Sequence, residues 1–173
     1  MLSMTWIDVL FAILGVIVTA VVGILGLIFG FKWFDRLTKD IKEIKEIEKG
    51  NIATAIFLGG VIISIAIVIY PGAAGMNQEL IQLSGTGATW QEYGHEMIYG
   101  VLNMLIGIIV IVPTLYLVIK VEDWATKTID EYKELKRGNT AVAILLFFVI
   151  VGIALIIAPS LNNLAQMINY QLF

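Results

Sequence analysis

Three side chains that could bind a metal ion or transfer a proton lie close together in an otherwise apolar sequence. Glu92, His95 and Glu96 have the i, i+3, i+4 spacing that places side chains on one face of a helix. However, the chain has one histidine and no cysteine, and a protein metal site usually needs three or four ligands. We therefore predict no metal site and no cofactor. These weak candidates are interpreted as a polar cluster at the membrane surface.

No other combination of residues indicates catalysis. The sequence has no recognisable pairing of a nucleophile with a base, no paired carboxylates and no nucleotide-binding loop. Its apolar segments also lack an ionisable residue near their middle, where proton pumps and ion-coupled carriers usually have one. Asn103 is one of the few polar residues there, and either lines a pore or bonds a neighbouring helix. We predict that the protein is not an enzyme.

The elements that position these residues are apolar helices. Hydrophobic residues make up 59% of the 173 residues, against about 45 to 50% in soluble domains. Four segments are near or above the roughly 18 to 20 apolar residues that a bilayer requires: 7–31, 52–70, 97–119 and 140–158. The sequence predicts an all-α integral membrane protein with four transmembrane helices. Pro71 and Pro159 are expected to bend or end two of these spans, with a loop over residues 72–96 after the first.

All eleven lysines and arginines lie in two segments, residues 32–49 and 120–137. Positive charge concentrates on the cytoplasmic side of membrane proteins. We therefore predict that both segments are cytoplasmic and that both termini and residues 72–96 lie outside. The same segments contain ten acids, which leaves them a net charge of only +1. This balance argues against a nucleic-acid partner and against strong capture of anionic lipid by a basic patch.

The chain contains an internal repeat. Residues 35–71 recur at 123–159 with 19 of 37 positions identical and a constant offset of 88. We interpret the chain as two units, residues 1–84 and 85–173. Each unit has two spans, so both insert in the same orientation. Such parallel repeats are expected to be related by a pseudo-two-fold axis along the membrane normal.

An amphipathic segment precedes the second span of each unit, at residues 35–49 and 123–137. Its apolar residues, such as Ile41, Ile44 and Ile47, have helical spacing. We predict a helix that lies along the membrane surface or joins a cytoplasmic collar. A Gly-Asn turn follows, in which glycine ends the first helix and asparagine caps the next. The turn residues are Gly50, Asn51, Gly138 and Asn139.

Around both turns the sequence reads Lys/Arg-Gly-Asn-x-Ala-x-Ala-Ile, at Lys49 to Ile56 and Arg137 to Ile144. With the charged segment and the apolar span before it, this pattern is similar to the YjfL-like bacterial and archaeal membrane family, domain of unknown function 350, as two tandem copies. The resemblance implies a multi-pass protein of a prokaryotic plasma (inner) membrane. It implies no established activity and no catalytic residue. It rests mainly on Gly50, Asn51, Ala53, Gly138, Asn139 and Ala141.

Small residues in the first span suggest close helix contacts. Gly26 and Gly30 form a Gly-x-x-x-Gly pattern, and with Asn103 they are candidates for helix packing or for a pore. Our leading hypothesis is a noncatalytic structural or scaffolding protein, surrounded by lipid, that forms a homo-oligomer or binds a membrane-protein partner. The alternatives are a subunit of an oligomeric channel and a membrane-remodelling protein whose amphipathic helices act as wedges.

Overall fold

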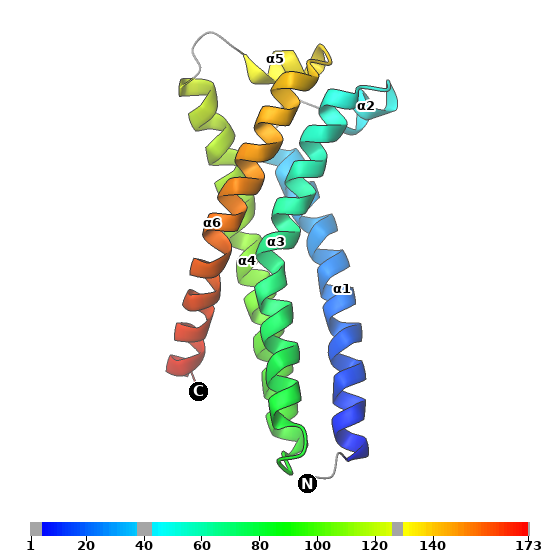
Figure 1. The fold of residues 1–173 in the computed structure, drawn as a ribbon, viewed down its shortest axis with the longest axis vertical. Coiled ribbons are helices and arrows are strands. Elements are labelled where there is room, and N and C mark those ends of the chain that lie inside the picture. The colour runs from blue at the N-terminus through cyan, green and yellow to red at the C-terminus, as the bar shows by residue number, and fades with distance from the viewer. Residues whose placement is uncertain (1–4, 38–42, 126–129, 173) are drawn as a thin grey trace.

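The computed structural model describes residues 5–37, 43–125 and 130–172, all of them in helices or short turns, and confirms the all-α fold class (Figure 1). Four of its helices are long and apolar enough to cross a membrane. Two short helices lie together at one end of the bundle, the α2–α5 end. The helices are α1 (Trp6–Leu37), α2 (Glu43–Glu48), α3 (Ile52–Leu83), α4 (Trp90–Ala125), α5 (Glu131–Lys136) and α6 (Thr140–Leu172).

The long helices extend beyond the predicted spans. Pro71 and Pro159 lie inside α3 and α6 and do not end them. The loop predicted over residues 72–96 is therefore limited to residues 84–89, between the end of α3 and the start of α4. Proline removes one backbone hydrogen bond, but the residues after Pro71 are held by packing. Met76 and Leu80 of this extension are 1% and 3% exposed, and their burial favours continuing the helix to Leu83.

The predicted amphipathic helices differ from the observed ones. Residues 35–37 belong to α1, α2 contains only six residues, and Ile41 lies outside the described residues. Within α2, Ile47 of the predicted apolar stripe packs against the core, but Ile44 is 48% exposed and Glu43 is fully buried instead. The reason is that α2 packs against α3, which sets the orientation of so short a helix. In α5, the predicted stripe residues Tyr132 and Leu135 are buried.

Helix α3 is the centre of the bundle and contacts α1, α4 and α6. In its most apolar segment 56% of the residues are buried, against 17% in α1, so α1 lies at the periphery. The core is formed by aliphatic and aromatic side chains from all four long helices. Its fully buried members include Phe34, Phe57, Ile65, Met76, Met104, Ile111, Leu115 and Leu146.

Glycines bring α1 close to its neighbours. A Cβ atom added at Gly26 would lie 2.8 Å from Cδ1 of Ile108 on α4 and 3.0 Å from Cδ1 of Ile69 on α3. A Cβ atom at Gly30 would lie 3.0 Å from Cδ1 of Ile65 on α3. The Gly-x-x-x-Gly residues therefore pack within the chain.

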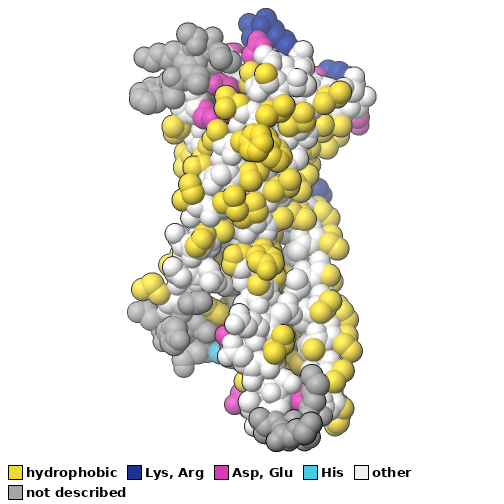
Figure 2. Space-filling view, viewed as in Figure 1, with side chains coloured by type: hydrophobic (Ala, Val, Ile, Leu, Met, Phe, Trp, Pro, Cys, Tyr) yellow, Lys and Arg dark blue, Asp and Glu magenta, His cyan; other side chains and the backbone are white. Residues whose placement is uncertain are grey.

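Figure 2 shows hydrophobic side chains over most of one face, with the lysines and arginines of that face towards the α2–α5 end. The histidine lies near the opposite end. We call this opposite end the tryptophan end, after Trp6 and Trp90, which begin α1 and α4. An apolar middle between polar ends is typical of a multi-pass membrane protein.

Candidate functional site

Both Gly-Asn turns have the same local geometry. Gly50 and Gly138 have φ angles of +83° and +81°, a region in which a side chain is strained. The side-chain oxygen of Asn51 accepts a hydrogen bond from the Thr54 amide at 3.1 Å, and that of Asn139 accepts one from the Ala141 amide at 3.2 Å. Each asparagine thus caps the long helix that follows it.

The two asparagines differ in the bonds that their amide nitrogens donate. Asn51 Nδ2 reaches from the first unit to the second and donates to the Leu135 carbonyl at 2.8 Å. Asn139 Nδ2 donates instead to Glu134 Oε2 of its own unit, also at 2.8 Å. A two-fold relation would pair Asn139 with the carbonyl of Ile47, which stands 88 positions before Leu135. The observed bonds run in one direction, from unit 1 to unit 2.

Each turn also contains an ion pair at matched positions. Lys49 Nζ lies 2.7 Å from Glu46 Oε1, and Arg137 Nη1 lies 2.8 Å from Glu134 Oε1. The hydrogen bond from Lys49 holds the pKa of Glu46 below its ordinary value. For Glu134, the hydrogen bond from Asn139, followed by that from Arg137, lowers the pKa. Both carboxylates are therefore stabilised in the ionised form.

The contact between α3 and α6 is also one-directional. A Cβ atom at Gly60 of α3 would lie 2.9 Å from Cδ1 of Ile150 on α6. At the repeat offset of 88, Gly60 is equivalent to Phe148 and Ile150 is equivalent to Ile62. Two-fold symmetry would therefore require a contact between Phe148 and Ile62. Instead Phe148 is 66% exposed and Ile62 is 38% exposed. The expected pseudo-two-fold relation between the units is therefore wrong, because α3 and α6 meet through different faces.

The contact between α3 and α4 is also one-directional, because the equivalent residue of α6 does not make it. A Cβ atom at Gly72 would lie 2.9 Å from the Met104 nitrogen, and one at Gly107 would lie 3.0 Å from the Val68 carbonyl oxygen. In α6 the residue equivalent to Val68 is Ile156, which is 71% exposed, and Ser160, equivalent to Gly72, is exposed too. One stripe is buried on α3 and open on α6.

Helix α1, the equivalent of α4 in unit 1, also exposes the face that corresponds to the α3-contacting face of α4. Helices α1 and α4 begin with Thr-Trp pairs 84 positions apart and end 88 positions apart, and α4 is longer, with 36 residues against 32. Four residues are about one helical turn, so corresponding faces stay aligned. Met104 of α4 corresponds to Val16 of α1 if the helices are aligned at their ends, 88 positions apart, and to Ala20 if they are aligned at their starts, 84 positions apart. Val16 is 65% exposed, and Ala20 is exposed.

At the tryptophan end, α1 and α4 are joined. The Tyr93 hydroxyl donates a hydrogen bond of 2.5 Å to Asp8 Oδ1, and the rings of Phe11 and Tyr93 stack with centroids 4.5 Å apart. The Trp6 and Trp90 rings lie 5.8 Å apart. The sequence does not predict this contact directly. Asp8, the one acid within a predicted apolar span, was the signal that a polar partner was needed.

The three weak metal candidates do not converge on one point. The carboxylate of Glu92 accepts hydrogen bonds from the Thr89 amide at 2.7 Å and the Thr89 hydroxyl at 2.9 Å. It therefore caps α4. Glu96 is partly buried, with Glu79 and His95 nearby. Within the described ranges, no three histidine or acidic side chains are grouped so that they could hold a metal ion.

Asn103, the pore candidate, lies on the face of α4 that meets α3. It is 8% exposed, and its backbone carbonyl carbon would lie 3.3 Å from a Cβ atom at Gly72. A polar contact links α3 to α1, where Asn77 Nδ2 donates to Thr19 Oγ1 at 3.3 Å. Asn103 is thus buried where α4 meets α3, and Asn77 bonds α3 to α1.

Comparison with known families gives a match over residues 6–161 to the Domain of Unknown Function (DUF350). The chain belongs to this family. The match runs as one stretch over both units of this DUF350 protein, and the duplication is read from the sequence itself. No curated protein and no solved structure matches the chain. It is a membrane protein of an uncharacterised family.

Proposed function

We propose that this DUF350 protein is a noncatalytic structural component of the membrane that associates with copies of itself head to tail. The observation that carries the proposal is the one-directional contact between its units. Unit 1 presents one face of α3 to unit 2, and the same face of α6 is exposed at the end of the chain. A second copy can cover this face by repeating the internal contact.

The repeated contact specifies which residues meet. Phe148 of one copy would pack on Ile62 of the next, as Gly60 packs on Ile150 within the chain. The α6 stripe around Ser160 would pack on the α1 stripe around Val16 of the next copy. Because each copy uses two different faces, the contact is heterologous and builds a ring or a filament.

The Asn139 side chain also supports a contact from unit 2 of one copy to unit 1 of the next. Asn51 donates across the internal contact to the Leu135 carbonyl. In the next copy the equivalent acceptor is the carbonyl of Ile47. Asn139 Nδ2 has two hydrogens, of which one is used by Glu134. The other is available for this bond between copies.

We place the assembly in the plasma (inner) membrane of a prokaryote, with the α2–α5 end in the cytoplasm. The support is the distribution of lysine and arginine, which lie only in residues 32–49 and 120–137. The channel alternative has less support because Asn103 packs against α3. The wedge alternative has less support because α2 is short and buries Glu43 rather than Ile44.

Cysteine cross-linking tests the proposed contact, since the natural chain has no cysteine. The double variant Phe148→Cys/Ile62→Cys, oxidised in lipid vesicles, should form a ladder of dimers, trimers and larger species. A matched control, Phe148→Cys/Phe29→Cys, uses an exposed residue on the other side of the bundle and should stay monomeric. Cross-links in the single variant Phe148→Cys would instead indicate a two-fold contact. Only monomers, both here and by native mass measurement in nanodiscs, would refute self-association.

A further inference from the structure

A groove lies between α1 and α4. The two helices are joined at the tryptophan end by the Tyr93–Asp8 hydrogen bond and the Trp6–Trp90 ring contact. Midway along them is a partly open cavity of about 480 Å³ whose lining is entirely apolar. Leu25 and Phe29 form its α1 side, and Leu105 and Ile109 form its α4 side. A cavity of this kind in the bilayer suits a hydrocarbon chain.

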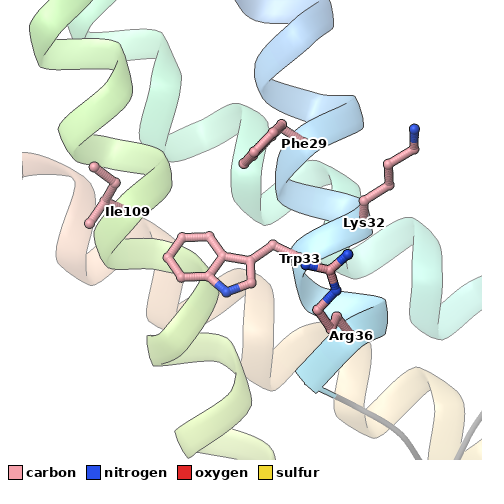
Figure 3. Close-up of a pocket in the computed structure, with 5 residues that line it drawn as sticks. All are labelled: Phe29, Lys32, Trp33, Arg36 and Ile109. Atoms are coloured by element: carbon pink, nitrogen blue, oxygen red, sulfur yellow. The ribbon is translucent and has the colours of Figure 1, made fainter.

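The groove continues into a second cavity of about 440 Å³ that contains positive charge. Phe29, Trp33 and Ile109 line both cavities, and Lys32 and Arg36 join them in the second. Figure 3 shows the Trp33 indole extending from α1 towards Ile109 on α4, with Arg36 near its base, while the Lys32 side chain extends from α1 away from Ile109. One groove therefore passes from an apolar section to a cationic section.

Its two cations are available for an external anion. Among the residues that the structure describes, the ion pairs are those of Lys49 and Arg137, and neither Lys32 nor Arg36 takes part in one. Lys120, the repeat-equivalent of Lys32, is engaged differently, since its Nζ lies 5.3 Å from the centre of the Tyr132 ring. The cationic section is thus specific to α1.

We propose that this groove binds an anionic glycerophospholipid. One acyl chain would occupy the apolar cavity between Leu25 and Leu105, and the phosphate would bind Lys32 and Arg36. Guanidinium and ammonium groups are the usual protein ligands of phosphate. Tryptophan prefers the boundary between the hydrocarbon and the headgroups of a bilayer. Trp33 lines both the apolar and the cationic cavity, so a lipid bound as proposed would place this boundary at Trp33. The near-neutral charge of residues 32–49 and 120–137 argues against strong capture of anionic lipid by a basic patch, whereas the proposed site uses two local cations.

The lipid site does not depend on the proposed self-association. Leu25 stands nine residues from Val16, and nine residues are two and a half helical turns. The groove and the surface proposed for the next copy are therefore on opposite sides of α1. Either proposal can fail without affecting the other.

Native mass spectrometry of the full chain in detergent tests the site, with phosphatidylglycerol and phosphatidylcholine of identical acyl chains as probes. Each interfacial cation contributes about a fivefold preference for anionic lipid. We expect the wild-type chain to prefer phosphatidylglycerol roughly five- to twentyfold. Lys32→Gln/Arg36→Gln should remove that preference, and the matched control Lys45→Gln/Lys133→Gln, at two exposed cations, should retain it. Equal loss in both double variants, or no preference in the wild type, would overturn the proposal.

Two further measurements test whether the bound ligand is a lipid in the groove or a free anion. Leu25→Trp fills the apolar section while keeping both cations, and should reduce lipid binding even if the charge variant fails to fold. Inorganic phosphate should not displace the bound lipid, because it has no acyl chain. Displacement by phosphate, together with normal lipid binding in Leu25→Trp, would identify a simple anion site and refute the lipid.

Discussion

The Tyr93 hydroxyl donates a hydrogen bond to Asp8 Oδ1, and through it the first helix of unit 1 is tied to the first helix of unit 2. Asp8 is 6% exposed and Tyr93 is fully buried. Tyr93→Phe should therefore lower the thermal midpoint, because it leaves a buried carboxylate without this donor. The control Tyr70→Phe removes a hydroxyl from a side chain that is 69% exposed and should have little effect. Equal midpoints for both variants would show that the bond adds no stability.

Gly72 is predicted to be essential for the approach of α3 to α4. Its added Cβ would lie 2.9 Å from the backbone nitrogen of Met104, which cannot move aside as a side chain can. Gly72→Ala should destabilise the protein by roughly 1 to 3 kcal/mol, as overpacked cores do. Gly75→Ala is the matched control, since a Cβ there meets nothing within 4 Å. Reversible unfolding in SDS would measure both, and a neutral Gly72→Ala would contradict this account of the contact.

The Gly-Asn turns should not tolerate a side chain at glycine. Gly50 and Gly138 have φ angles above +80°, and alanine in that region costs about 1 to 2 kcal/mol. Gly50→Ala and Gly138→Ala should each lose that amount in SDS unfolding. Gly59→Ala, within helix α3 where a Cβ meets nothing, should instead be neutral or stabilising. Loss of stability in all three variants would point to a general intolerance of alanine.

Acid should weaken the turn of the second unit. The pKa of Glu134 is lowered from its ordinary value of 4.5 by hydrogen bonds from Asn139 and Arg137. A lowered pKa in the folded state adds stability above the unfolded value, and this stability is lost as the pH falls through the folded value. Thermal melts of the wild type should therefore fall below about pH 4.5 more steeply than those of Glu134→Gln. Parallel pH profiles for the two proteins would disprove the assignment.

Local chemistry explains which parts of the fold the sequence predicts. Four apolar segments of bilayer length give four spanning helices, and a glycine followed by an asparagine between two helical segments is typical of a helix end and a new cap. The lengths of the helices are less predictable, because Pro71 normally argues for a break. Here the burial of Met76 and Leu80 decides in favour of continuity, and burial depends on neighbours that a local pattern does not reveal.

The arrangement of the two units could not be predicted from their similarity. Identical sequence at 19 positions shows that Phe148 and Gly60 are equivalent, but it does not show that Gly60 is covered by α6 while Phe148 is exposed. The groove of Lys32 and Trp33 was missed for a similar reason. Its walls come from α1 and α4, which are far apart in the sequence, so no local pattern reveals the groove.

The peripheral position of α1 has a consequence for the order of synthesis. Its glycines pack against Ile65 and Ile69 of α3 and Ile108 of α4, and its Asp8 bonds to Tyr93. All these partners follow α1 in the chain. Helices in a bilayer can insert separately before they associate, so a newly inserted α1 must wait in the lipid with its contacts unmade. The second unit, when it is translated, completes the first.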